Sequence, residues 1–122
     1  MPSILQNIRR RDITFYRDGR INLTARISKT LGLKPGDSID IITEGGEYYL
    51  HAIHHGLAVG HGVAQCRQAR PDSPSLYVNS IALCRAMFLA IGFDGDKAAF
   101  AVGPAIIKNT KPYLPIITRM LL

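Results

Sequence analysis

Residues 19–49 read GRINLTARISKTLGLKPGDSIDIITEGGEYY, and the succession of elements that they predict is the main indication of the fold. Its first segment alternates the apolar residues Ile21 and Leu23 with polar neighbours, which is the pattern of a strand with one buried face. Thr24 follows as the N-cap of a short helix, and Gly32 is placed to end that helix. The sequence thus predicts a strand that runs directly into a capped helix.

The second part of this stretch predicts a forced turn and a β-hairpin. Pro35 fixes its own φ and Gly36 is free to take a positive φ, so the chain turns there. Ser38–Thr43 then alternates apolar and polar residues, and a Gly-Gly pair leads into a second strand over Tyr48–Ile53. We therefore expect a hairpin directly after the helix.

Another hairpin is predicted upstream. Ile13–Tyr16 is β-branched and aromatic, and Asp18-Gly19 is typical of a tight turn before the strand Arg20–Leu23. Residues 12–55 thus predict one unit made of a hairpin, a helix and a second hairpin. Residues 1–11 are predicted to be a separate basic N-terminal arm.

This order of elements resembles the SpoVT/AbrB family of swapped-hairpin proteins. The resemblance covers about residues 12–53 and is carried by Arg20–Leu23, Leu31–Asp37 and Ile39–Ile41. Its most specific part is Leu31–Asp37, which reads LGLKPGD. It implies a small β barrel, made of two intertwined copies, that binds DNA as a transcriptional regulator or as an antitoxin. One feature differs from the family, because its members often begin the helix with a proline where this chain has Thr24-Ala25.

The rest of the chain, residues 62–122, follows a similar order and predicts a degenerate second unit. Its predicted elements are strands over 63–68 and 75–78, a helix over 81–91 capped by Asn79 or Ser80 and ended by Gly92, and closing strands over 98–102 and 113–118. Two units in one chain imply a single-chain pseudo-dimer, as in the tandem-repeat MraZ proteins. The predicted fold is therefore mainly β with short helices: a swapped-hairpin, AbrB-like β barrel, formed either by a homodimer or by a single-chain pseudo-dimer.

The charge of the chain is basic and is concentrated near its start. The 122 residues have a formal net charge of +6 and a pI of about 9.7. Residues 1–35 carry eight Lys or Arg against two Asp, whereas residues 36–61 carry four acidic residues and no Lys or Arg. Such a cationic surface favours a polyanionic partner, and we predict double-stranded DNA.

The predicted DNA-contacting residues are arginines and one asparagine of the first half: Arg9, Arg10, Arg11, Arg17, Arg20, Asn22 and Arg26. Arginine suits this role because its guanidinium donates paired hydrogen bonds to phosphate or guanine, and a basic arm can follow the minor groove. Arg20 and Asn22 share the strand face opposite the apolar residues, so they are the favoured base-reading or phosphate-binding pair. The alternative interpretation is a basic surface that is simply exposed to solvent.

Patterns for other site chemistries are weaker. The chain has a cluster of four histidines: His51, His54, His55 and His61. No cysteine or acidic ligand lies within the cluster, so no metal is predicted and exposed or hydrogen-bonded histidines are favoured. Cys66 and Cys84 show no CxxC spacing and are expected to be reduced thiols. No nucleophile-and-base motif, P-loop or dinucleotide fingerprint is present, so the sequence predicts no cofactor and no enzyme.

We predict a cytoplasmic protein that binds double-stranded DNA and acts as a transcriptional regulator. We expect no secretory signal and no membrane association, because the N-terminus lacks an apolar segment with a cleavage site and no apolar run reaches the length of a membrane span. The alternative is a protein-interaction or antitoxin-type scaffold in which the apolar C-terminal segment Tyr113–Leu122 docks a protein partner.

Overall fold

The computed structural model describes residues 11–54, 65–68, 71 and 73–118. The elements in chain order are β1 (Ile13–Tyr16), β2 (Arg20–Leu23), α2 (Ala25–Leu31), β3 (Ser38–Glu44), β4 (Glu47–Ile53), β5 (Arg67–Gln68), β6 (Leu76–Asn79), α3 (Ile81–Ile91), β7 (Lys97–Phe100), β8 (Ile106–Lys108) and β9 (Lys111–Ile116). The predicted mainly β fold is confirmed.

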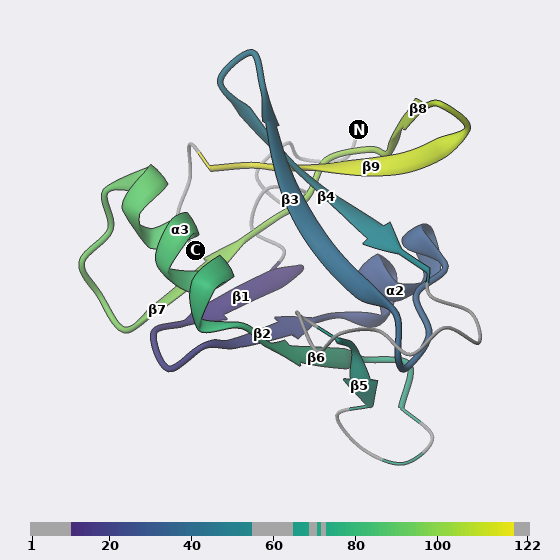
Figure 1. Ribbon diagram of the computed structural model, residues 1–122, viewed down its shortest axis with the longest axis horizontal. Coiled ribbons are helices and arrows are strands. Elements are labelled where there is room, and N and C mark those ends of the chain that lie inside the picture. The colour runs from purple at the N-terminus through teal and green to yellow at the C-terminus, as the bar shows by residue number, and fades with distance from the viewer. Residues whose placement is uncertain (1–10, 55–64, 69–70, 72, 119–122) are drawn as a thin grey trace, which may run out of the picture.

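The strands form two antiparallel sheets (Figure 1). One sheet has the strand order β5-β6-β2-β1-β7, and the other has the order β3-β4-β9-β8. The two helices lie on opposite sides of the paired sheets, with α3 on the left and α2 on the right of the view in Figure 1. Within the described ranges neither sheet closes on itself, so the structure shows two open sheets.

Both sheets combine strands from the two halves of the chain. In the first sheet, β2 pairs with β6 and β1 pairs with β7. In the second sheet, β4 pairs with β9. A single bridge between Ser38 and Gln65 also joins the start of β3 to the segment before β5. Each half therefore completes its sheets with strands of the other half.

The two helices end alike but begin differently. Gly32 and Gly92 end them in the left-handed region, with φ values of 65° and 67°, as the sequence predicts. Ser80 caps α3, because its hydroxyl accepts a hydrogen bond from the Leu83 N–H at 3.1 Å. Thr24 occupies the N-cap position of α2 but makes no side-chain cap bond, and its hydroxyl is buried without a partner among the described residues. The predicted N-cap position of Thr24 is therefore confirmed, but the hydrogen bond of a side-chain cap is not made.

The hydrophobic core is built from both halves. Phe15 on β1 and Phe100 on β7 are fully buried and pack edge to face, with ring centroids 6.0 Å apart. Leu50 on β4 and Leu114 on β9 belong to the same buried cluster. Burying one such side chain stabilises the fold by about 1.5–3 kcal/mol. Because the buried cluster has members from both halves, both contribute to the stability.

The second half differs from its prediction at several strands. Of the strand predicted over 63–68, the described residues show β5 at Arg67–Gln68, and β9 runs over Lys111–Ile116 rather than over 113–118. The predicted strand over 98–102 ends earlier, at Phe100, and Val102 makes only an isolated bridge with Ile116. The structure also contains β8, which pairs with β9 where a loop is expected. The turn between them is formed by Asn109 and Thr110, both at positive φ. Threonine is not a residue from which a positive φ is predicted, so the sequence does not indicate this turn.

Candidate nucleic-acid interface

Alternation along β2 separates a buried face from an outward polar face. Ile21 and Leu23 are at most 1% exposed, and they belong to the core. Arg20 and Asn22 alternate with them and therefore lie on the opposite face of the strand. The structure thus brings these two predicted residues together.

Strand pairing extends the outward face across the first sheet. The outward polar residues of the first sheet are named the polar sheet face here: Thr14, Tyr16, Arg20, Asn22, Arg67, Tyr77, Asn79 and Lys97. Three of these side chains are cationic, two are tyrosines, two are asparagines and none is a carboxylate. Such a face matches the donors and rings that proteins present to nucleic acid.

The register places residues of different strands next to one another. Asn22 on β2 lies opposite Tyr77 on β6, and Tyr77 lies opposite Arg67 on β5. Arg20 lies opposite Asn79 in the neighbouring row. Directly opposed residues of antiparallel strands have side chains in contact range, so both halves of the chain contribute to one continuous face.

The side chain of Arg20 is held in place on this face. Its Nε donates a hydrogen bond to Asn22 Oδ1 at 2.9 Å, and its guanidinium carbon lies 4.7 Å from the ring centroid of Tyr77. Asn22 in turn donates to the hydroxyl of Tyr16 at 3.4 Å. Arg20 is therefore preorganised by one hydrogen bond and one cation–π contact.

Arg17 lies at the edge of the sheet, beside α3. Its Nε donates to the carbonyl oxygen of Gly95 at 2.8 Å, and its guanidinium lies 4.9 Å from the ring centroid of Phe88. Arg85 lines the same shallow hollow. Two guanidiniums therefore flank this end of the molecule.

Arg26 has a structural partner. Its Nη1 lies 3.1 Å from Oδ2 of Asp12, a carboxylate that is only 1% exposed. Because Asp12 directly precedes β1, this ion pair connects α2 to the first sheet. The contact restrains Arg26, whose side chain remains 41% exposed.

The predicted arginines therefore divide between the two ends of the β1–β2 hairpin. Arg17 and Arg20 lie at its turn, whereas Arg11, which is exposed, and Arg26 lie at its open end. The six positions from Arg11 to Arg17 span roughly 20 Å of extended chain. Two further predicted residues, Arg9 and Arg10, lie outside the described residues.

Six members of the polar sheet face are missing from the residues predicted by sequence: Thr14, Tyr16, Arg67, Tyr77, Asn79 and Lys97. No local motif marks them. The signal that could have found those of the second half is strand register: β6 against β2 places Tyr77 opposite Asn22, β5 against β6 places Arg67 opposite Tyr77, and β7 against β1 places Lys97 opposite Tyr16. The pairings of β6 with β2 and of β7 with β1 join segments more than 50 residues apart, so sequence periodicity does not provide them.

The two histidines within the described residues make separate contacts. His51 stacks on Tyr113, with ring centroids 4.9 Å apart. His54 Nδ1 lies 2.8 Å from Oδ2 of Asp37. The rest of the predicted cluster lies outside the described residues: His55 and His61.

Both cysteines are buried free thiols. Burial raises the pKa of the Cys66 thiol from 9.0 to about 12, and the negative charge of Asp37 acts in the same direction. Burial likewise raises the pKa of the Cys84 thiol to about 11. Both thiols are therefore protonated near neutral pH, which does not suit a nucleophile.

We expect these thiols to react slowly in the folded protein. Near pH 8 a pKa of about 12 lowers the thiolate population about 1,000-fold for Cys66, and a pKa of about 11 lowers it about 100-fold for Cys84. Colorimetric disulfide exchange, compared with the protein unfolded in guanidinium, measures both rates. Reaction of the folded protein at the unfolded rate would contradict the burial of the thiols.

The same shift makes stability depend on alkaline pH. The folded protein holds the Cys66 proton more tightly than the unfolded chain does. The contribution of this protonated thiol to the free energy of unfolding is therefore complete below pH 9 and is lost as the pH rises towards about 12. Denaturant unfolding of the wild type and of Cys66→Ala at several alkaline pH values measures it. The wild type should lose stability more steeply above pH 9 than the variant.

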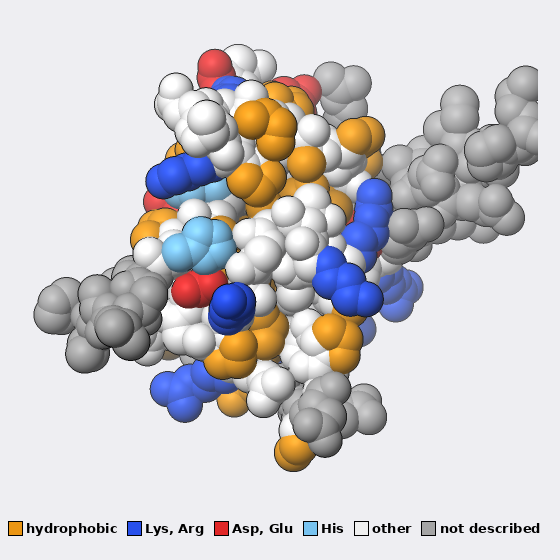
Figure 2. Space-filling model, turned by 90° about the vertical axis from the view of Figure 1, so that its right-hand side faces the viewer, with side chains coloured by type: hydrophobic (Ala, Val, Ile, Leu, Met, Phe, Trp, Pro, Cys, Tyr) orange, Lys and Arg blue, Asp and Glu red, His pale blue; other side chains and the backbone are white. Residues whose placement is uncertain are grey.

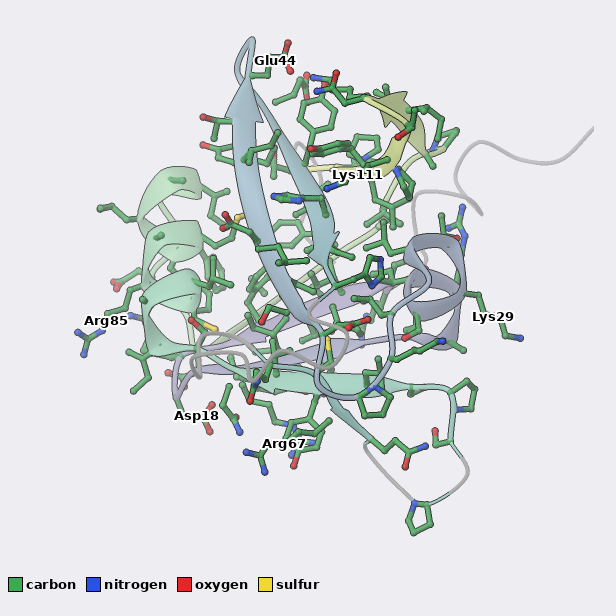
Figure 3. All side chains as sticks on the ribbon, turned by 45° about the vertical axis from the view of Figure 1, so that its right-hand side comes forward. Asp18, Lys29, Glu44, Arg67, Arg85 and Lys111 are labelled. Atoms are coloured by element: carbon green, nitrogen blue, oxygen red, sulfur yellow. The ribbon has the colours of Figure 1, made fainter. Side chains whose placement is uncertain are left out.

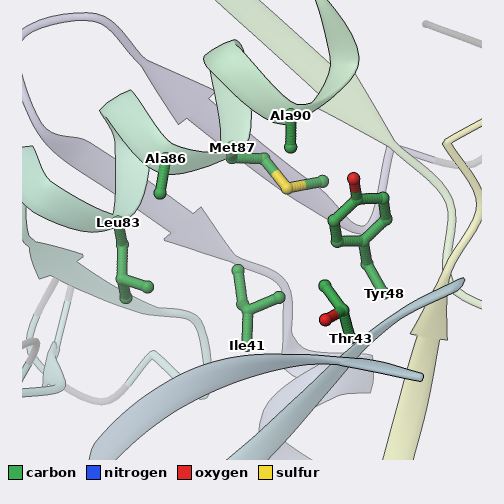
Figure 4. Close-up of a pocket in the computed structure, with 7 residues that line it drawn as sticks. All are labelled: Ile41, Thr43, Tyr48, Leu83, Ala86, Met87 and Ala90. Carbon is green, nitrogen blue, oxygen red and sulfur yellow. The ribbon is translucent and has the colours of Figure 1, made fainter. Parts of the chain in front are cut away.

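An apolar groove lies between α3 and the β3–β4 hairpin (Figure 4). It has a volume of about 160 Å³ and is lined by Ile41, Thr43, Tyr48, Leu83, Ala86, Met87 and Ala90. None of these side chains is charged. Leu89, on the same helix, is 84% exposed. The groove therefore suits an apolar partner rather than a phosphate backbone.

Basic side chains lie in several places on the side of the molecule in Figure 2. Some lie singly among uncharged and hydrophobic side chains, and several gather on the right of this view. On the opposite sheet, Lys108 pairs with Glu44 and lies 4.9 Å from the ring centroid of Tyr49. Its charge is thus partly compensated, whereas no ion pair to Arg20, Arg67 or Lys97 is found within the described part of the chain.

Comparison with known proteins does not identify the chain: no protein-family model, characterised protein or solved structure was found to match it. Neither helix in the described part of the chain has the length and apolar character needed to cross a membrane.

Proposed function

We propose that this protein binds double-stranded DNA through the polar sheet face and acts as a transcriptional regulator. The observation that carries the proposal is the composition of this face, with three cations and no carboxylate among its eight residues. Of the predicted residues, Arg20 and Asn22 lie on it, Arg17 lies at its edge, and Arg11 and Arg26 lie at the other end of the hairpin. The basic arm with Arg9 and Arg10 would add further phosphate contacts.

The proposed architecture is a swapped-hairpin, AbrB-like barrel in which two tandem units act as a single-chain pseudo-dimer. The pairing of β2 with β6 and of β4 with β9 supports it, because each pair joins corresponding strands of the two halves. The pairing of β1 with β7 and the bridge from Ser38 to Gln65 are also equivalent between the halves. We place the protein in the cytoplasm, where its two free thiols stay reduced.

Binding of this kind would be largely electrostatic. Each phosphate neutralised by Lys or Arg releases counterions, so the logarithm of affinity falls with the logarithm of salt concentration with a slope of about −0.9 per contact. Three or four contacts from the face and its edge predict a slope of about −3. Sequence preference would come from the paired donors of Arg20 and the amide of Asn22.

Reversing the charge of Arg20 tests the proposal. Arg20→Glu should weaken binding to a fluorescent mixed-sequence duplex of about 30 base pairs by about 30-fold, since one phosphate contact is replaced by repulsion. Fluorescence anisotropy across a salt series measures both affinity and slope. Arg20 is a better target than Arg26, because a carboxylate at residue 26 would face the buried Asp12.

Lys29→Glu is the matched control, because Lys29 is exposed on α2, away from the polar sheet face (Figure 3). It changes the net charge equally and should alter affinity only slightly. If the folded wild type does not bind even at low salt, DNA binding is ruled out as its function. Equal losses in the two variants would show attraction by net charge rather than a defined face.

The apolar groove favours a second candidate function, in which the protein is an interaction or antitoxin-type scaffold. The uncharged lining of the groove supports a protein partner, and the exposed Leu89 on the same helix, which lines the hollow beside Arg17, adds apolar surface. Part of the predicted docking segment is not available, however, because Leu114 and Ile116 are buried in the core. A folded protein that lacks DNA binding would favour this candidate.

A further inference from the structure

We propose that the second half of the chain completes the DNA interface, with Arg67 contacting phosphate and Tyr77 positioning Arg20. This inference rests on the proposed function and adds two residues to its site. Arg67 and Tyr77 belong to β5 and β6, whereas Arg20 and Asn22 belong to β2. The site would therefore depend on the association of the two halves.

Arg67 is placed for a phosphate contact by the register of three strands. It lies opposite Tyr77, which lies opposite Asn22, so all three side chains share one row of the outward face. Arg67 is exposed. Two strand spacings separate β5 from β2 by about 10 Å, an axial distance covered by about three phosphates of one DNA strand. Cations on both strands can thus follow one backbone.

Tyr77 acts on Arg20 rather than on DNA. Its ring lies under the guanidinium at 4.7 Å from the guanidinium carbon, while Asn22 accepts the hydrogen bond from Nε. Among the described residues, no side chain or carbonyl accepts a hydrogen bond from the two terminal nitrogens of Arg20. These are the nitrogens that make paired hydrogen bonds with phosphate or guanine.

Holding the guanidinium in advance reduces the conformational entropy that Arg20 loses when it binds. Removing the ring should therefore weaken binding even though Tyr77 itself contacts no DNA. Removing only the hydroxyl should leave binding intact, because the cation–π contact uses the ring. Tyr77→Phe and Tyr77→Leu separate these effects.

Arg67 has a matched control in Lys29. Figure 3 shows the two residues on different sides of the molecule, with Arg67 below β6 and Lys29 on α2. Arg67→Gln and Lys29→Gln each remove one positive charge. A phosphate contact is lost only in the first, so the salt slope distinguishes a contact from a general change in net charge.

The experiment is anisotropy of the full chain and its variants with the same mixed-sequence duplex across a salt series. Arg67→Gln should weaken binding about fivefold and make the slope shallower by about 0.9, while Lys29→Gln leaves the slope unchanged. Tyr77→Leu should weaken binding about fivefold and Tyr77→Phe less than about twofold. Circular dichroism verifies that each variant is folded, and Tyr77→Met replaces Tyr77→Leu if that variant unfolds.

The outcomes distinguish this inference from the function on which it rests. Absence of binding by the wild type overturns both. Binding that is lost in Arg20→Glu but is unaffected in Arg67→Gln and in the ringless Tyr77 variants overturns this inference alone. If Arg67→Gln and Lys29→Gln have equal salt slopes, Arg67 is not part of the interface. If Tyr77→Phe and Tyr77→Leu lose equal affinity, the ring is not the group that positions Arg20.

Discussion

Replacing Gly19 with alanine is expected to lower the free energy of unfolding by about 3 kcal/mol. Gly19 forms the β1–β2 turn at a φ of 106°, a conformation that L side chains rarely adopt. A Cβ there would lie 2.7 Å from Cγ1 of Ile81 and 3.1 Å from its backbone nitrogen. The first helical turn of α3 packs against this turn of the sheet, and Ser80 N–H donates to the Gly19 carbonyl at 2.7 Å.

Gly36→Ala is the matched control for this prediction. Gly36 has a similar φ of 95°, but a Cβ there would meet no atom within 4 Å. Its cost should be about 1 kcal/mol, from backbone conformation alone. Denaturant unfolding of both variants therefore isolates the steric part, and equal destabilisation would show that α3 moves freely away from the turn.

Replacing Asp12 with alanine is expected to cost a similar amount, about 3 kcal/mol. The Asp12 carboxylate is 1% exposed, and its Oδ2 accepts hydrogen bonds from Arg26 at 3.1 Å and from the Val102 N–H at 3.0 Å. Alanine would leave the buried Val102 amide without this acceptor. Since Arg26 is partly exposed, water would compensate its lost partner, and most of the cost would arise at the amide.

Asp12→Asn tests whether the cost arises at the Val102 amide or at the ion pair with Arg26, because the asparagine side-chain oxygen can still accept from the Val102 N–H. We expect asparagine to restore roughly half of the stability lost in alanine, measured by urea unfolding at neutral pH. If asparagine and alanine destabilise equally, the charge interaction with Arg26 carries the stabilisation instead. The sequence offers little indication of this role, since Asp12 directly follows three arginines, at the boundary between the predicted arm and the predicted unit.

Sequence patterns within single segments correctly predicted strands and helix ends. Alternation at Ile21 and Leu23 identified β2, and the glycines at 32 and 92 marked both helix ends. Thr24 was correctly placed as the N-cap of α2 but makes no side-chain cap bond, because residue type identifies a cap position without fixing where its hydroxyl points. The turn at Asn109 and Thr110 was missed, because its conformation is set by the pairing of β8 with β9.

The candidate site was predictable only in part. Alternation within β2 was enough to put Arg20 and Asn22 on one face. The contact of Arg20 with Tyr77 depends on a pairing between strands that lie more than 50 residues apart, and no periodicity within either segment contains that information. The partner of Arg26 was hidden for the same reason, because α2 and the start of β1 meet only after the sheet forms.

The exchange of strands between the halves has a consequence for synthesis on the ribosome. When β4 leaves the ribosome, its partner β9, about 65 residues further along the chain, has not yet been synthesised. At about 5–20 residues per second, β4 therefore has no β9 to pair with for several seconds. Throughout that interval the nascent chain presents open strand edges beside apolar side chains such as Leu50. We expect neighbouring ribosomes on one transcript to raise the risk of pairing between nascent chains, and a chaperone that shields the first half to improve the yield of native protein.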